Sequence, residues 1–172
     1  MLEIPTIETE RLILRPHRLS DLDACVALSA DEAVVRYISG VPSTREQTWV
    51  RVLRWVGMWH FLGYGFLVVE EKESGRYVGE AGFQEMHRDM EPSIEGTLEA
   101  GWVLSADVQG RGYGTEAMNA LIAWAEARFP GKTMSCIIDP RNEPSLRLAA
   151  KLGFREAART EYNNSEITVL LR

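Results

Sequence analysis

The alternation of apolar and polar residues along the chain predicts strands on both sides of a central glycine-rich loop. Short apolar segments typical of strands lie at residues 11–15, 65–70, 76–86, 98–104, 133–138 and 167–171. The second and third of these segments should form an antiparallel hairpin, because turn-forming residues at 73–75 separate them. We expect a shorter strand near residues 155–160 to pair with the last one.

Apolar residues at helical spacing predict helices between these strands. Ser20, with Asp23 three residues later, is expected to cap a short helix that ends near residue 29. Thr44 and Gln47 form a similar capping pair before a longer helix. The residues of the longer helix that its spacing assigns to the core are Trp49, Val52, Leu53, Val56 and Trp59 or His60.

Two further helices are expected at residues 115–129 and 145–151, the second of them closed by Gly153. The first separates the strands at 98–104 and 133–138, so these strands should lie parallel in a strand–helix–strand crossover. The pattern therefore predicts a single mixed α/β domain over residues 1–172. Its N-terminal strands are antiparallel, and its parallel strands flank the glycine-rich loop.

The loop sequence VQGRGYGTEA, at residues 108–117, has three glycines in five residues between a strand and a helix. A loop with few Cβ atoms lets a ligand contact the main-chain N–H groups directly. The first turn of the following helix adds unpaired N–H groups and the positive end of the helix dipole. These features predict an anion site, and hence a ligand that carries a phosphate or diphosphate group.

The amino-acid composition limits the classes of molecule that the protein can bind. A net charge of −6 argues against nucleic acid, because binding a phosphate backbone requires a basic surface. The N-terminal residues lack the order of a signal peptide and no segment is apolar enough to cross a membrane, so we expect a cytoplasmic protein. Its two cysteines are far apart and fit reduced thiols, with Cys136 inert in a buried strand. The spacing of His, Cys and acidic residues predicts no metal site.

Glycine-rich loops of this kind bind three kinds of phosphate ligand. A P-loop requires a lysine directly after the glycines, and the nearest one here is Lys132. A dinucleotide site matches Gly112, Gly114 and Ala117, with Asp139 at the end of the next strand. However, only 33 residues follow Asp139, too few for the second half of a doubly wound sheet. An NAD-binding oxidoreductase is therefore a remote alternative.

The third ligand is acetyl-CoA. The run QGRGYG at residues 109–114 satisfies the Q/R-x-x-G-x-G/A loop of the GCN5-related N-acetyltransferase (GNAT) superfamily. The segments TERLILRP, SDLDAC, EAGWVL and NEPS followed by KLGF occur in that family's order. The chain therefore resembles GNAT enzymes over nearly its whole length, and in particular the ribosomal-protein N-terminal acetyltransferases (RimJ/RimL-like).

The resemblance implies a GNAT-like fold in which the two parallel strands splay apart to admit acetyl-CoA as co-substrate. It implies that the pantetheine arm pairs with the strand at Val103 and Leu104, while main-chain N–H groups at 111–115 hold the diphosphate. Asn142 either contacts the pantetheine arm or only favours the turn before Pro144. The full set of expected coenzyme contacts is Val103, Leu104, Gln109, Gly110, Arg111, Gly112, Tyr113, Gly114, Thr115, Asn142 and Ser145.

Acetyl transfer to an amine requires a base and stabilisation of the departing thiolate. The resemblance implies Glu99 as the base, acting through water; the alternative is a carboxylate at the strand edge that faces solvent. It implies that Ser145 stabilises the thiolate, because Ala149 stands where other members of the superfamily have a tyrosine. The alternative for Ser145 is capping of the helix. His87 either contacts the substrate or lies on the surface.

The sequence thus predicts an acetyl-CoA-dependent N-acetyltransferase that acts directly on a primary amine, without an acyl-enzyme and without a metal. The acceptor is either a protein N-terminus or a small amine such as an amino acid, a polyamine or an aminoglycoside. Glutamates 91, 95 and 99 are expected to attract a cationic acceptor. The alternative is an acyl-CoA-binding sensor that has lost turnover. We expect a monomer or a homodimer.

Overall fold

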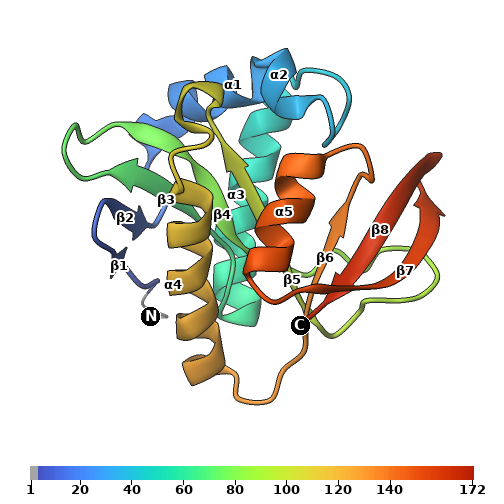
Figure 1. Cartoon of the computed structure of the whole chain (residues 1–172). Coiled ribbons are helices and arrows are strands. Elements are labelled where there is room, and N and C mark those ends of the chain that lie inside the picture. Colours follow the sequence, from blue (N-terminus) through green and yellow to red (C-terminus); the bar gives the residue numbers. More distant parts are fainter. Residues whose placement is uncertain (1–3) are drawn as a thin grey trace.

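The computed structural model describes residues 4–172, and its strands form one eight-stranded mixed sheet (Figure 1). The strands in chain order are β1 (Ile7–Glu8), β2 (Leu12–Arg15), β3 (Phe66–Glu71), β4 (Tyr77–Gln84), β5 (Leu98–Leu104), β6 (Met134–Ile138), β7 (Arg155–Tyr162) and β8 (Ser165–Leu171). Their order across the sheet is β1-β2-β3-β4-β5-β6-β8-β7. Within the described residues only β5 and β6 pair in parallel, which confirms the predicted mixed α/β fold.

Helices cover both faces of the sheet (Figure 1). They are α1 (Leu22–Ala30), α2 (Glu32–Val35), α3 (Arg45–Leu62), α4 (Tyr113–Arg128) and α5 (Glu143–Lys151), with short 3-10 turns at Leu19–Asp21 and Ala106–Val108. Helices α4 and α5 lie on one face, and α1 and α3 lie on the other. Among residues 4–172, no helix combines the length and the hydropathy that a membrane crossing demands.

The start of α1 differs from the predicted cap. Ser20 lies inside the 3-10 turn, and Asp21 rather than Asp23 accepts the N–H of Arg18, at 2.7 Å. The reason is a buried ion pair, because both oxygens of Asp21 also accept hydrogen bonds from the Arg15 guanidinium at 2.8 and 2.9 Å. The predicted capping role of Ser20 and Asp23 was therefore wrong.

Helix α3 begins as predicted but buries a different face. Thr44 and Gln47 exchange the two hydrogen bonds of a capping box. Val52 and Trp59 are buried as expected, but Leu53 and Val56 are 49% and 47% exposed. Trp55 and Met58 take their place in the core. The predicted core positions lie one residue away from most of the buried ones, so the buried stripe is rotated by about 100° from the predicted one on a helix of 3.6 residues per turn.

The main core lies between the sheet and α4. Phe83 and Leu98 on the sheet, and Met118 and Leu121 on α4, are fully buried. Burial of each such side chain contributes about 1.5–3 kcal/mol to folding. This packing fixes the axis of α4, and with it the position of the glycine-rich loop that leads into the helix.

The parallel pair β5–β6 is joined over two residues only. Leu98 pairs with Met134 and Glu99 pairs with Ser135. Beyond Glu99, β5 pairs with β4 alone, and β6 pairs with β8. A gap therefore opens in the sheet after Glu99, as the predicted splay of these strands requires.

Candidate active site at the gap between strands β5 and β6

One edge of β5 presents main-chain polar groups to the gap. The Leu98 N–H points to the β6 side, where it donates to Thr133 O at 2.9 Å, and the Ser105 N–H points to the β4 side, where it donates to Val78 O at 2.9 Å. Main-chain groups alternate in direction along a strand, so Val103 is directed towards β4. The residues of β5 beyond the paired segment whose main chain faces the gap are Ala100, Trp102 and Leu104.

The glycine-rich loop at residues 109–115 carries several unpaired N–H groups. Two of its N–H groups make long turn hydrogen bonds of 3.3 Å, from Gln109 to Ala106 O and from Arg111 to Val108 O. Within the described residues, the loop N–H groups that have no protein acceptor are those of Gly110, Gly112, Tyr113, Gly114 and Thr115. This supply of donors at a helix N-terminus is suited to a diphosphate.

The three loop glycines meet different requirements. Gly110 and Gly112 have positive φ angles of 79° and 81°, a conformation that favours glycine. A Cβ on Gly114 would lie 2.9 Å from Leu148 Cδ2 and 3.5 Å from Leu104 Cδ1. Gly114 therefore lets α4 begin in close contact with α5 and β5, a packing role that the sequence motif did not reveal.

The loop is anchored to the N-terminal strands through Glu116. Its carboxylate accepts hydrogen bonds from Thr9 Oγ1 at 2.6 Å, and from the Arg11 main-chain N–H and Nε at 2.7 Å each. Burial raises the pKa of Glu116, but these hydrogen bonds outweigh it and hold the pKa below its ordinary value. Arg11 also donates from Nη1 to the carbonyl of Arg111 at 2.9 Å, which fixes the loop main chain.

Tyr113 links the loop to the end of β3. Its hydroxyl donates to Glu71 Oε1 at 2.5 Å, which raises the pKa of Tyr113 and lowers that of Glu71. The guanidinium groups of Arg11 and Arg111 each lie 4.7 Å from the centre of its ring. Arg111 also lies 3.2 Å from Glu71, so its side chain is oriented by the protein although it is half exposed.

Glu99 occupies the point where the gap begins. It is only 4% exposed, so the alternative of a carboxylate facing solvent was wrong. Arg88 donates to its two oxygens from Nε at 2.9 Å and from Nη2 at 2.8 Å, and Gln84 Nε2 donates to Oε1 at 2.8 Å. The carboxylate is thus held in one orientation beside the gap.

Ser145 lies in the first turn of α5, and its contact with Trp102 places it beside β5. Its Oγ accepts a hydrogen bond from Trp102 Nε1 at 3.3 Å, and its N–H donates to Asn142 Oδ1 at 3.3 Å. Asn142 is therefore the helix cap, and the alternative of a capping role for the Ser145 side chain was wrong. Because the indole supplies the hydrogen in the contact with Trp102, the Ser145 hydroxyl hydrogen remains available to a ligand.

Two other candidates from the sequence make no contact with Glu99 or Ser145 in the described residues. The side chain of His87 is 71% exposed, with Nδ1 2.8 Å from Glu95 Oε1. Cys136 is buried, and burial raises the pKa of its thiol to about 12. The thiol therefore stays protonated near neutral pH, as expected for an inert core cysteine.

A cluster that the sequence did not predict lies between α1 and β4. The ligating atoms of His17, Cys25 and Glu80 all lie within 4.8 Å of one another. His17 Nε2 is 2.9 Å from Glu80 Oε1, and Cys25 Sγ donates to the same oxygen at 3.4 Å. Burial raises the pKa of Cys25 to about 12, and Arg51 lies beside Glu80. A protonated thiol and a neighbouring guanidinium favour a hydrogen-bonded core network over a metal site.

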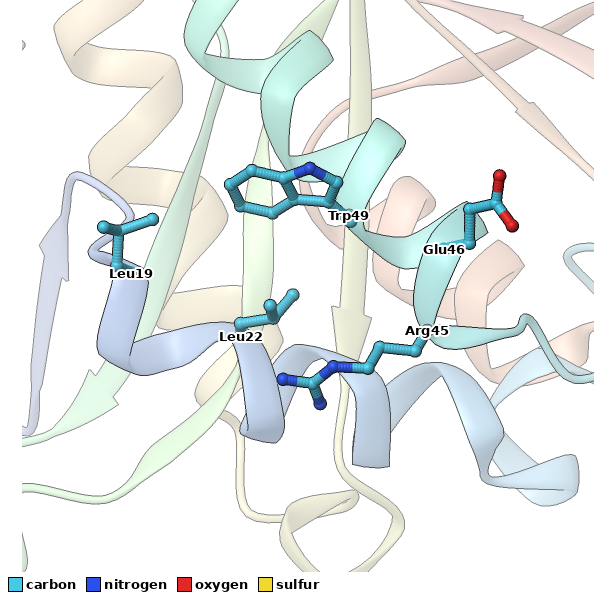
Figure 2. Close-up of a pocket in the computed structure, with 5 residues that line it drawn as sticks. All are labelled: Leu19, Leu22, Arg45, Glu46 and Trp49. Carbon is cyan, nitrogen blue, oxygen red and sulfur yellow. The ribbon is translucent and has the colours of Figure 1, made fainter.

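A separate surface pocket of about 650 Å³ lies between α1 and the start of α3. Its lining residues are Leu19, Leu22, Arg45, Glu46 and Trp49 (Figure 2). In this view the Trp49 ring lies above the side chains of Leu19 and Leu22 (Figure 2). None of its lining residues belongs to the glycine-rich loop or to β5, so the pocket is distinct from the gap.

Comparison with known proteins agrees with this geometry. The model of the acetyltransferase (GNAT) domain matches residues 11–155. A structure described as a GNAT-family acetyltransferase from Bordetella pertussis is 33% identical, with a TM-score of 0.87 over 98% of this chain and 99% of that one. The uncharacterised N-acetyltransferase p20 of Bacillus licheniformis is 26% identical over 153 residues, which cover 88% of this chain and 83% of that protein.

A more distant structure shares the fold alone. It is RimL, a ribosomal L7/L12 α-N-protein acetyltransferase in complex with coenzyme A, which is 16% identical with a TM-score of 0.79 over 98% of this chain and 97% of that one. Residues 4–172 contain one parallel strand pair, whereas an NAD-binding fold requires a doubly wound parallel sheet, so this topology and these matches overturn the NAD-binding alternative. The chain therefore belongs to the GNAT family and is an acetyl-CoA-dependent acetyltransferase.

Proposed function

We propose that the enzyme transfers the acetyl group of acetyl-CoA directly to a primary amine, either a protein N-terminus or a small molecule. One observation carries this proposal: β5, which borders the gap after Glu99, leads through a short 3-10 turn into a loop with five unpaired N–H groups. The loop fits a diphosphate, and the free edge of β5 fits the amide groups of a pantetheine arm. Of the two predicted contacts on β5, the orientation of the strand favours Leu104 over Val103. It also adds Trp102, which was not predicted.

Main-chain groups make most of the proposed contacts with acetyl-CoA. The N–H groups of Gly110 and of residues 112–115 would bind the diphosphate oxygens, and Arg111 would add positive charge at the rim of the loop. The side chain of Gln109 reaches back towards Leu104 O, at 3.5 Å. Asn142 acts indirectly, because its side chain caps α5 and thereby positions Ser145.

Two side chains are assigned to proton transfers. Glu99, oriented by Arg88, accepts a proton from the acceptor ammonium through water, which leaves a neutral amine. The amine nitrogen then bonds to the acetyl carbon as the carbon–sulfur bond breaks. The Ser145 hydroxyl donates a hydrogen bond to the sulfur, which leaves as a thiolate. The second proton, which the nitrogen loses as it becomes an amide, passes through solvent to this thiolate.

Direct transfer is supported by the lack of a suitable cysteine nucleophile at the gap among residues 4–172. Cys136 is 1% exposed and its pKa is raised to about 12, so it is unsuited to accept an acetyl group. The expected kinetics are therefore those of a complex containing both substrates, with no partial reaction of acetyl-CoA in the absence of an amine.

Thiol release from acetyl-CoA, measured across a panel of primary amines, tests this function. At least one amine should support turnover, and Glu99→Gln should lower kcat by about 10²–10⁴-fold, the usual contribution of general base catalysis. Glu95→Gln, in the loop before β5, is the matched control and should leave kcat unchanged. Coenzyme binding without turnover on any amine would instead assign the chain to the acyl-CoA-binding sensors.

A further inference from the structure

Arg54 lies at the end of a column of aromatic rings that rises from β5. Its guanidinium lies 4.9 Å from the Trp55 ring, and this ring stacks on Phe66 at 4.2 Å with an interplanar angle of 7°. Phe66 in turn covers Gly101, where a Cβ would lie 2.6 Å from the Phe66 ring. Gly101 is two residues beyond Glu99, so the column brings Arg54 to the face of the sheet that carries the candidate base.

The charges around Arg54 do not balance. Arg88 is paired with Glu99, and Arg51 lies 3.3 Å from Glu80. Within residues 4–172, no carboxylate lies within ion-pair distance of Arg54. Burial, followed by repulsion from Arg51 and Arg88, lowers the pKa of Arg54 from its ordinary value. These three arginines and two glutamates leave one net positive charge.

Unpaired hydrogen-bond donors also lie on the part of α3 that carries Arg54. Arg51 Nε and Trp55 Nε1 are buried N–H groups that have no acceptor in the described part of the chain. The guanidinium of Arg54 is exposed and has no carboxylate partner among the described residues, so it is free to bind a charged acceptor with two parallel hydrogen bonds. Arg51, Arg54 and Trp55 therefore offer unpaired donors near Glu99 to a negatively charged group that has several acceptor atoms.

We propose that this group is a carboxylate of the acceptor, and that Arg54 binds it while the amine of the same molecule lies beside Glu99. The inference rests on the proposed function and narrows the acceptor to amines that carry a carboxylate, of which a free α-amino acid is the simplest. It differs from the expectation that Glu91, Glu95 and Glu99 attract the acceptor as a cation. Of the glutamates behind that expectation, Glu99 is paired with Arg88, and Glu95 lies 2.8 Å from His87.

The test compares each free amino acid with its own carboxamide as acceptor, so that the side chain and the amine position stay constant. Loss of the carboxylate should lower kcat/KM by about tenfold or more, the effect of one charge-assisted hydrogen bond. The amine of the carboxamide is the less basic of the two, so its reactivity biases the comparison against the proposal. Peptides with an N-terminal aspartate, set against N-terminal asparagine, test whether a side-chain carboxylate serves instead.

Arg54→Gln should remove the preference for the carboxylate and leave acetyl-CoA affinity and the melting temperature unchanged, while Arg54→Lys should keep part of the preference. Arg45→Gln, on the same helix but paired with Asp23, is the matched control and should keep the full preference. A preference in either the free amino acids or the peptides, lost in Arg54→Gln, supports the proposal.

Equal kcat/KM for acids and amides, or a preference that survives Arg54→Gln, overturns the carboxylate inference and leaves the acetyltransferase function intact. Absence of turnover on every amine, in a protein that still binds acetyl-CoA, overturns the proposed function itself. The two failures are therefore distinguishable in one set of assays.

Discussion

Trp102 and Ser145 lie on opposite sides of the gap and are joined by a hydrogen bond of 3.3 Å from the indole Nε1 to the hydroxyl oxygen. This contact fixes the serine oxygen and leaves its hydrogen to be donated. Because a hydrogen bond to a charged group contributes about 1.5–3 kcal/mol, Ser145→Ala should lower kcat by about tenfold or more. Steady-state kinetics with saturating acetyl-CoA check this expectation.

The control for Ser145 is Trp102, its hydrogen-bond partner on β5. Ser145→Ala removes only the side chain, so the cap made by Asn142 and the melting temperature should be retained. Trp102→Phe should reduce kcat less than Ser145→Ala, because it orients the serine without contacting the sulfur. An unchanged kcat in Ser145→Ala would leave protonation of the thiolate to solvent.

Gly131, which follows α4, is a matched control for Gly110 in the glycine-rich loop. Both have positive φ angles, of 79° and 80°, and a Cβ on either meets no atom within 4 Å. Alanine at each position should therefore cost a similar 1–2 kcal/mol or so of stability from backbone strain. Only Gly110→Ala should also weaken acetyl-CoA binding, measured by calorimetry. Equal affinities in the two variants would contradict diphosphate binding at the loop.

The ion pair between Glu116 and Arg11 predicts a pH dependence of stability. The pKa of Glu116 in the folded state lies below its ordinary value of 4.5, so its contribution is complete above about pH 4.5 and is lost as the pH falls through the folded-state pKa. The melting temperature should fall less steeply in this acid range for Glu116→Gln than for the wild type. Glu143→Gln, at a side chain that is 77% exposed, should follow the wild type.

The two thiols should be unreactive in the folded protein. Cys25 and Cys136 are 0% and 1% exposed, and burial raises the pKa of each to about 12. At pH 8 a thiol reagent should therefore modify neither cysteine until the protein unfolds, when both should react. Rapid labelling of the native enzyme, followed by mass spectrometry, would refute this expectation.

The glycine-rich loop and the parallel pairing of β5 and β6 were predictable because they depend on the main chain. Positive φ angles at Gly110 and Gly112, and the parallel placement of β5 and β6, follow from local turn chemistry and from the crossover rule. The capping box at Thr44 was predictable for the same reason, since both partners lie within four residues. The comparisons then established the family that these segments resemble.

The acceptor side was not predictable from the sequence. Arg54 and Arg88 come from a helix and a loop more than 30 positions apart, and neither lies in a motif. Long flexible side chains reveal their partners only once the elements are packed, which also explains why the capping role of Asp21 was assigned to Asp23. The orientation of Glu99 by Arg88 belongs to the same class of long-range contact.

The short seam between β5 and β6 has a mechanical consequence. In the sheet, the strands β1 to β5 and the strands β6 to β8 meet through two residue pairs alone, at Leu98 and Glu99. A donor molecule lying in the gap would supply the cross-strand contacts that the protein lacks, so it would couple the two halves as an additional strand does. Binding of acetyl-CoA should therefore slow hydrogen exchange of the main-chain N–H groups near Leu98 and Glu99. Release of the coenzyme product should restore the faster exchange.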